Sequence, residues 1–181
     1  MFQEVDPVLG PEMRSTGEVL GLSQYYGEAF FKAQEATQTK LPLGGTVLIT
    51  VNNKDKDEMI EVARDLKEAG FKILATKGTQ KALADADIVS EFVYKLNEGR
   101  PNIIDFVTNG KIDLMIYTPA SASEHVDDSD LRKTAIKKKV PYITTIAAAK
   151  ATADGIKSMS LPGCGVVKSL QELHAEITDK E

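Results

Sequence analysis

Short apolar runs alternate with longer amphipathic segments along most of this sequence, and that alternation is what most constrains the fold. Residues 46–51, TVLITV, carry no charge and several β-branched side chains, which is typical of a strand buried on both faces. Residues 56–70, KDEMIEVARDLKEAG, carry apolar residues at helical spacing and end in glycine, which is typical of a helix. The same patterns predict further strands at 71–76, 88–95, 112–118 and 140–145, and further helices at 79–87, 102–110, 128–139 and 147–159.

Repeated β–α units of this length favour a parallel sheet, because each helix returns the chain to the edge where the next strand starts. The predicted fold class is therefore α/β. More specifically, we expect a Rossmann-like three-layer sandwich around a central five-stranded, mainly parallel sheet. Helices should cover both faces of that sheet.

The first forty residues fall outside this pattern. Residues 5–23 contain two prolines and three glycines without a sustained period, which favours loop, and a helical pattern follows at 25–40. The glycine-rich LPLGG at 41–45 then interrupts the helical pattern. We therefore divide the chain into a leading segment, 1–40, and a domain with a C-terminal tail, 41–181.

Composition argues against several classes of protein. The 181-residue chain has a formal net charge of −5 and 6% aromatic residues, so nucleic acid is not an expected partner. No apolar run approaches the roughly 18 residues needed to cross a membrane, and the N-terminus lacks the apolar core of a secretion signal. One cysteine, Cys164, permits no internal disulfide. We expect a cytoplasmic protein with no membrane partner.

Cationic and hydroxyl side chains follow successive predicted strands. The carboxyl ends of parallel strands share one edge of a sheet, where ligands bind in open α/β folds. A helix start there offers free N–H groups to an anion. Lysines add charge and threonines add hydroxyl donors. The candidate phosphate-binding residues are Lys56, Thr76, Lys77, Gly78, Thr79 and Lys95. The alternative is that Thr79 only caps a helix and the lysines only face solvent.

Catalytic machinery is harder to find. His125 and His174 are the only histidines, they lie far apart in the sequence, and neither has the spacing of a metal ligand. No Ser-His-Asp, Cys-His or paired-carboxylate arrangement stands out. Neither a G-x-x-x-x-G-K-[ST] nor a G-x-G-x-x-G motif is present. We therefore predict no catalytic residue, no metal and no cofactor in this chain.

Several stretches resemble one family closely. GPEMRSTGEV and NEGRPNIID are specific, and they occur together with GFKILATKGTQKAL and a C-terminal LQELH. The sequence resembles the methylglyoxal synthase-like domain at the C-terminus of the carbamoyl phosphate synthase large chain. Its leading segment resembles the end of the second ATP-grasp half of that large chain. The resemblance implies a regulatory domain that binds a nucleotide monophosphate, such as UMP or IMP, as an allosteric effector.

The resemblance also implies residue roles. The phosphate contacts would fall on Lys56, Thr76, Thr79 and Lys95. The nucleoside contacts would fall on Tyr117 and Thr118, although Tyr117 stands where the family has an amide and Pro119 where it has a hydroxyl. An ornithine-type site would involve Tyr142 and Thr144.

The parent enzyme implied by the resemblance makes carbamoyl phosphate from bicarbonate, glutamine-derived ammonia and two ATP, for pyrimidine and arginine biosynthesis. ATP and Mg²⁺ would bind its other domains. The implied partners are the rest of the large chain, the glutaminase small subunit, the effector, ornithine and further copies of the chain in a homo-oligomer.

Two alternatives to this function stay open. One is a phosphate-eliminating lyase of the methylglyoxal synthase type, against which Pro101 counts because it stands at the position of the lyase's carboxylate base. The other is a structural or oligomerising module.

Overall fold

A five-stranded parallel sheet forms the centre of the molecule. The computed structural model describes residues 19–37, 40–118 and 125–178. Within them the sheet runs in the order β3-β2-β1-β4-β5, and every pair of neighbouring strands is parallel. The strands are β1 (Thr46–Thr50), β2 (Lys72–Ala75), β3 (Glu91–Phe92), β4 (Leu114–Tyr117) and β5 (Tyr142–Ile143). The predicted α/β sandwich with five strands is confirmed, and the sheet is wholly parallel.

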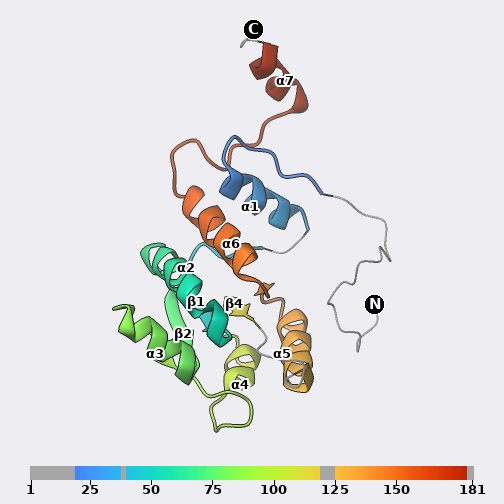
Figure 1. Cartoon of the computed structure of the whole chain (residues 1–181). Coiled ribbons are helices and arrows are strands. Elements are labelled where there is room, and N and C mark those ends of the chain that lie inside the picture. The colour runs from blue at the N-terminus through green and yellow to red at the C-terminus, as the bar shows by residue number, and fades with distance from the viewer. Residues whose placement is uncertain (1–18, 38–39, 119–124, 179–181) are drawn as a thin grey trace.

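Helices cover both faces of this sheet and make the outer layers (Figure 1). The helices are α1 (Tyr26–Ala36), α2 (Lys56–Glu68), α3 (Lys77–Asp85), α4 (Ile103–Thr108), α5 (His125–Lys137), α6 (Ile146–Ser158) and α7 (Leu170–Thr178), and a short 3-10 turn, η1 (Asn53–Asp55), precedes α2. Side chains from α2, α3 and α6 join the apolar cluster on one face, and side chains from α4 and α5 join the cluster on the other. The predicted three-layer arrangement is therefore present.

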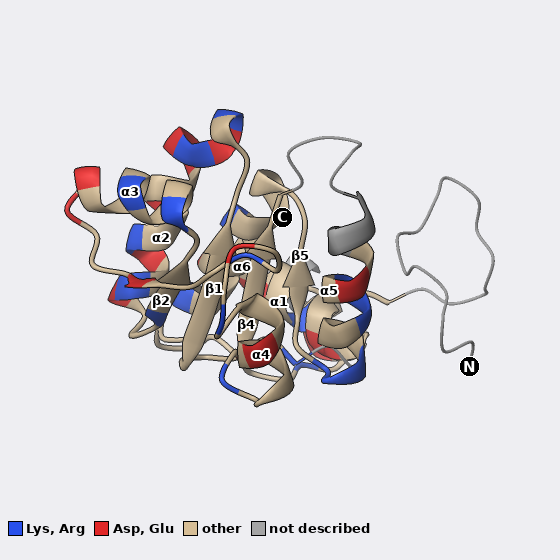
Figure 2. Ribbon diagram, turned by 90° about the horizontal axis from the view of Figure 1, so that it is seen from below, with Lys and Arg blue, Asp and Glu red and all other residues tan. Residues whose placement is uncertain are grey.

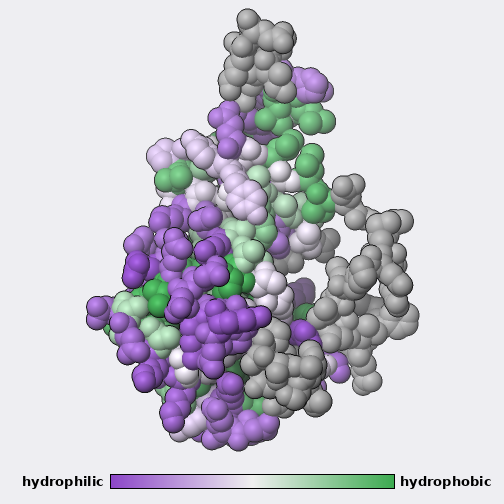
Figure 3. All heavy atoms as spheres, viewed as in Figure 1, coloured by the Kyte–Doolittle hydropathy of each residue, from purple (hydrophilic) through white to green (hydrophobic). Residues whose placement is uncertain are grey.

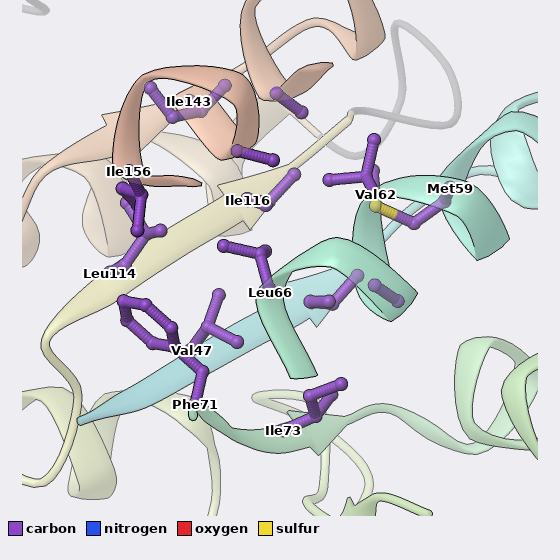
Figure 4. Close-up of a cluster of buried hydrophobic side chains, with 14 of the residues drawn as sticks. Val47, Met59, Val62, Leu66, Phe71, Ile73, Leu114, Ile116, Ile143 and Ile156 are labelled. Carbon is purple, nitrogen blue, oxygen red and sulfur yellow. The ribbon is translucent and has the colours of Figure 1, made fainter. Parts of the chain in front are cut away.

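The larger cluster fills the space between the sheet and α2 and α6 (Figure 4). Val47, Leu66 and Ile116 are all at most 1% exposed there. Full burial of one such side chain contributes about 1.5 to 3 kcal/mol. Alternate residues of the strands point to opposite faces, so Leu48, which follows Val47, belongs to the second cluster. Burial on both faces explains why the strands read as uninterrupted apolar runs.

The first helix packs directly on α6 by backbone contact. A Cβ on Gly27 would lie 2.7 Å from the carbonyl carbon and oxygen of Asp154, and a Cβ on Gly155 would lie 3.0 Å from the carbonyl oxygen of Gly27. Only glycine at both positions permits this approach without movement. The end of the leading segment is thus built into the helical layer of the domain.

A buried carboxylate ties α1 to the loop that follows α6. Glu28 is 5% exposed and accepts hydrogen bonds from the Ser23 hydroxyl and, at 2.9 Å, from the N–H of Gly165. Its ion pair with Lys32 also measures 2.9 Å. The hydrogen bond from Ser23, followed by that from Lys32, lowers the pKa of Glu28 to about 2. Lys32 Nζ also donates to the carbonyl oxygens of Leu22 and Val166, which draws the two segments together.

Some predicted boundaries were wrong. The strand predicted at 88–95 pairs with β2 only at Glu91–Phe92, and beyond these residues Tyr94 forms a single parallel bridge with Asn102. The strand predicted at 140–145 is paired only at Tyr142–Ile143, after which Thr145 caps α6 through its hydroxyl. The segment after residue 159, predicted as a tail, contains α7, which projects beyond α1 in Figure 1.

Charge and hydropathy are distributed unevenly. Basic and acidic residues are interspersed along α2 (Figure 2), whereas α3 carries Lys77 and Lys81 in its first two turns and one acid, Asp85, at its end. Apolar side chains gather instead at the end of the molecule near α1 and the loop before α7 (Figure 3), where Leu20, Val167 and Leu170 are at least 64% exposed. In the described part of the chain, every helix is too short or too polar to span a membrane.

Candidate anion-binding site at the carboxyl edge of the sheet

The N-terminus of α3 is the centre of the candidate site. Thr76 occupies its N-cap with an extended backbone, φ −74° and ψ 156°, but its side chain makes no capping hydrogen bond. The first turn of α3 contains no acidic residue. Its N–H groups and the positive end of its dipole are therefore not compensated by a side chain of the helix itself.

Two buried threonine hydroxyls hold this helix start against the sheet. The hydroxyl oxygens of Thr76 and Thr50 lie 2.9 Å apart, and Thr79 Oγ1 accepts the backbone N–H of Val51 at 3.2 Å. Thr76 and Thr79 are 3% and 2% exposed. The Thr79 hydroxyl therefore joins α3 to the residue after β1 and does not act as the cap of α3, while Lys77 and Lys95 are exposed, as the alternative expects of the lysines. A hydroxyl that accepts one hydrogen bond can still donate another.

The three predicted lysines lie close to α3. A Cβ on Gly78 would come within 3.1 Å of Lys56 Nζ, so the ammonium lies against the first turn of α3. Lys77, Gly78 and Lys95 line one open groove of about 850 Å³. Two acids, Asp87 and Glu98, line it as well, and Glu98 accepts the backbone N–H of Lys95 at 3.3 Å. Three of the six predicted residues therefore line a groove that is not uniformly basic, and Lys56, Thr76 and Thr79 lie outside its lining.

We call the six residues predicted to bind phosphate the cradle. The end of β4 lies next to β1, close to this cradle. Thr118 is 5% exposed, and its Oγ1 accepts the backbone N–H of Asn52 at 3.0 Å, so it fixes the loop after β1. Tyr117 is partly exposed and is the register partner of Thr50. Pro119, which was also considered at the sequence level, lies outside the described residues.

The two predicted ornithine-type residues lie on and after β5. Tyr142 is partly buried, and Thr144 is exposed between β5 and α6. The ring of Tyr142 stacks on that of Tyr117, with centroids 6.2 Å apart and planes inclined by 24°. Residues assigned to two separate sites in the sequence are therefore in contact. Sequence reasoning named both tyrosines but missed their contact, and it did not single out Thr50, inside the first apolar run, or Asn52, directly after it.

The turn before α4 contains Pro101, the position where the resemblance would put the base of a lyase. Pro101 there precedes Asn102, whose side chain accepts the N–H of Asp105 at 3.2 Å. Asp105 Oδ2 accepts the N–H of Asn102 at 2.9 Å, which completes a capping box. Asp105, four residues after Pro101, is thus already engaged in capping α4.

Metal-binding groups are not evident. Among the described residues, no three side chains of histidine, cysteine, aspartate or glutamate come close enough to hold a metal ion. His174 lies exposed on α7, and His125 is the first residue of α5, so the two histidines belong to different helices. The arrangement around α3 therefore offers N–H groups, hydroxyls and ammonium groups, which is chemistry suited to holding an anion.

Comparison with known proteins shows which families the chain resembles. Residues 58–144 match the model of the MGS-like domain family, and this region of the chain belongs to that family. Over nearly its whole length, the chain is a homologue of the carbamoyl phosphate synthase large chain. The large chain of Methanosarcina mazei is 44% identical over 97% of this chain and 16% of its own length. That of Archaeoglobus fulgidus is 45% identical over 95% of this chain and 16% of its own length.

One relative is shorter, and its name states which part of the large chain it is. The protein of Methanopyrus kandleri named carbamoyl phosphate synthase large chain, C-terminal section, is 46% identical over 94% of this chain and 31% of its own length. The chain therefore spans less than a third of each of these three relatives.

Proposed function

We propose that this chain is an allosteric effector-binding domain of a carbamoyl phosphate synthase large chain, and that it binds a nucleotide monophosphate such as UMP or IMP. The observation that carries the proposal is the uncapped start of α3, with Lys56 Nζ against Gly78. A helix N-terminus and an adjacent ammonium stabilise a phosphate by charge-assisted hydrogen bonds. Homology with the large chain supports the regulatory context.

Binding at the cradle would act through the rest of the enzyme. An effector changes a distant site only through its different affinity for two conformations, typically by about 1 to 3 kcal/mol. Carbamoyl phosphate synthesis from bicarbonate, glutamine-derived ammonia and two ATP would belong to the other domains, which would bind ATP and Mg²⁺. The glutaminase small subunit and ornithine remain proposed partners. The proposed location of the protein is the cytoplasm.

The exposed apolar end of the molecule is the proposed contact with the rest of the large chain. Leu20 belongs to the leading segment, and Val167 and Leu170 lie beside it in the chain's C-terminal part, where Lys32 holds both segments. Large exposed apolar patches often mark interaction surfaces. A Leu20→Ser/Val167→Ser variant of a whole large chain should lose its response to the effector. The same substitutions in the isolated 181-residue chain should leave its affinity for the effector unchanged. An unchanged response would refute this contact.

Calorimetric titration tests the proposed function itself. The chain is titrated with inorganic phosphate, UMP and IMP, and Lys56→Ala is compared with Lys72→Ala. Lys72 is a matched control, because it is exposed at the opposite end of β2 from α3. Loss of one charge-assisted contact should cost about 1.5 to 3 kcal/mol of binding in Lys56→Ala only. Equal binding by both variants, or none by the parent chain, would refute the cradle.

A further inference from the structure

Tyr117 lies where the strand order of the sheet reverses. From β1 the chain adds β2 and β3 on one side, and then returns to place β4 and β5 on the other. Thr50 on β1 and Tyr117 on β4 are register partners at the carboxyl ends of these two strands. Ligands of open α/β sheets bind outside the strand ends at such a reversal point. The topology therefore places the Tyr117 ring at the expected crevice.

The ring also lies on the same face of the sheet as Thr76 of the cradle, although α2 and α3 themselves pack on the opposite face. Leu48, Leu74 and Met115 belong to the same buried cluster, and side chains two residues further along a strand point the same way. Those next side chains are Thr50, Thr76 and Tyr117. The Thr50 and Thr76 hydroxyl oxygens lie 2.9 Å apart. Thr76, Thr50 and Tyr117 therefore form a row along the carboxyl ends of β2, β1 and β4, and this row begins at the start of α3.

Tyr142 supports this ring from the neighbouring strand. Both tyrosines pack against the cluster beneath α4 and α5, and their stacked planes are inclined by only 24°. The Tyr142 hydroxyl oxygen is buried, whereas Tyr117 remains partly exposed at the edge. An aromatic ring held in this way is a preformed stacking surface that loses little conformational entropy on binding.

We infer that Tyr117, positioned by Tyr142, determines the specificity of the cradle, and that it selects phosphate esters carrying an aromatic base over esters carrying only a sugar. This inference rests on the proposed function, which supplies the phosphate site. Stacking uses the π-face that every base has, so it does not read hydrogen-bonding groups. The two tyrosines therefore accept purine and pyrimidine nucleotides alike. An amide side chain at position 117 would instead recognise a base through hydrogen-bond donors and acceptors.

Four probes separate the parts of the ligand: inorganic phosphate, ribose 5-phosphate, UMP and IMP. We expect both nucleotides to bind the 181-residue chain about 5- to 150-fold more tightly than ribose 5-phosphate, the range expected for stacking one base on an aromatic side chain. Tyr117→Leu should abolish this advantage and leave ribose 5-phosphate affinity unchanged. Tyr117→Phe and Tyr142→Phe should retain it, and Tyr142→Leu should reduce it.

Tyrosine fluorescence gives an independent readout. The chain has five tyrosines and no tryptophan, so its intrinsic emission comes from tyrosine. Nucleotides should quench this emission, ribose 5-phosphate should not, and Tyr117→Leu should lose most of the quenching. Circular dichroism confirms that each variant is folded.

The possible failures are distinct. Equal affinity for ribose 5-phosphate and nucleotides, or stronger nucleotide binding by Tyr117→Leu, would overturn the stacking role and leave the cradle intact. The second result would mean that the ring obstructs the base. Failure of inorganic phosphate and of every ester to bind would instead refute the proposed function, and the inference with it.

Discussion

The hydroxyl oxygens of Thr50 and Thr76 lie 2.9 Å apart across two neighbouring parallel strands, where both side chains are at most 4% exposed. This bond joins the end of β1 to the residue that starts α3. It therefore fixes the helix start relative to the sheet at the point where the cradle forms.

Removing one of these hydroxyls should leave the other buried without its partner. We expect Thr50→Val to lower the free energy of unfolding by about 1 to 3 kcal/mol, the cost of one buried unsatisfied group. Thr50→Val/Thr76→Val should cost less than the sum of the single variants, because no hydroxyl is then left unpaired. Urea unfolding measures all three. Strict additivity would show that the bond contributes nothing to the coupling of β1 and α3.

Gly78→Ala should weaken phosphate binding without destabilising the fold. The new methyl group would lie 3.1 Å from Lys56 Nζ and would force the ammonium a few tenths of an ångström away from the first turn of α3, whereas alanine is tolerated in a helix at least as well as glycine. We expect phosphate affinity to fall several-fold by calorimetry, with an unchanged urea midpoint. Gly44→Ala is the matched control, because no atom lies within 4 Å of its added Cβ. Equal phosphate affinities in the two variants would contradict this account.

Asn102 should hold the turn that contains Lys95. Its side chain caps α4, and Asn102 Nδ2 also donates to the carbonyl oxygen of Leu96 at 3.3 Å. Asn102→Ala should cost about 0.5 to 2 kcal/mol of unfolding free energy through loss of the cap. Asn102→Asp keeps the capping oxygen but loses the donor to Leu96. If that donor positions Lys95, Asn102→Asp should keep most of the stability and still bind phosphate more weakly. Parental phosphate affinity in Asn102→Asp would show that the Leu96 bond is irrelevant.

Glu28 should make stability depend on acid pH. Its pKa is about 2 in the folded chain, below the ordinary value of 4.5, so the ionised form is the one that folding favours. The contribution is present above pH 4.5 and is lost as pH falls toward 2. Glu28→Gln should therefore be less stable than the parent chain at pH 7, and the difference should shrink between pH 4.5 and 2. Urea midpoints at several pH values measure this.

The control for that experiment lies on the same helix. Glu35 is exposed on α1, so Glu35→Gln should follow the parent chain at every pH. A constant difference between Glu28→Gln and the parent chain across the acid range would contradict the assignment to Glu28.

The central strands were predictable because burial on both faces makes them uninterrupted apolar runs, and α2 was predictable because its apolar residues recur at helical spacing. Edge elements were not, since nothing in residues 88–95 reveals that only Glu91 and Phe92 find a partner in β2. Helix α7 was missed although a signal was present. Ser169 and Glu172 have the S-x-x-E spacing of a capping box, and in the structure Ser169 Oγ accepts the N–H of Glu172 at 3.2 Å.

The candidate site was predictable to the extent that it follows from chain order. Parallel strands bring their carboxyl ends to one edge, so residues near α3 could be grouped without coordinates. The stacking of Tyr117 on Tyr142 could not, because it depends on the register between β4 and β5. The role of Thr118 was also hidden, since only the folded loop brings the Asn52 N–H to its hydroxyl.

The glycine contact between α1 and α6 constrains how this sequence can vary over evolution. Gly27 and Gly155 face backbone atoms of the opposite helix, so no intervening side chain can absorb a change at either position. A larger residue on one helix cannot be offset by a smaller one on the other, because both are already glycine. Drift at either position therefore requires the helices to separate, and we expect both glycines to be retained among relatives that keep this seam while the surrounding surface diverges.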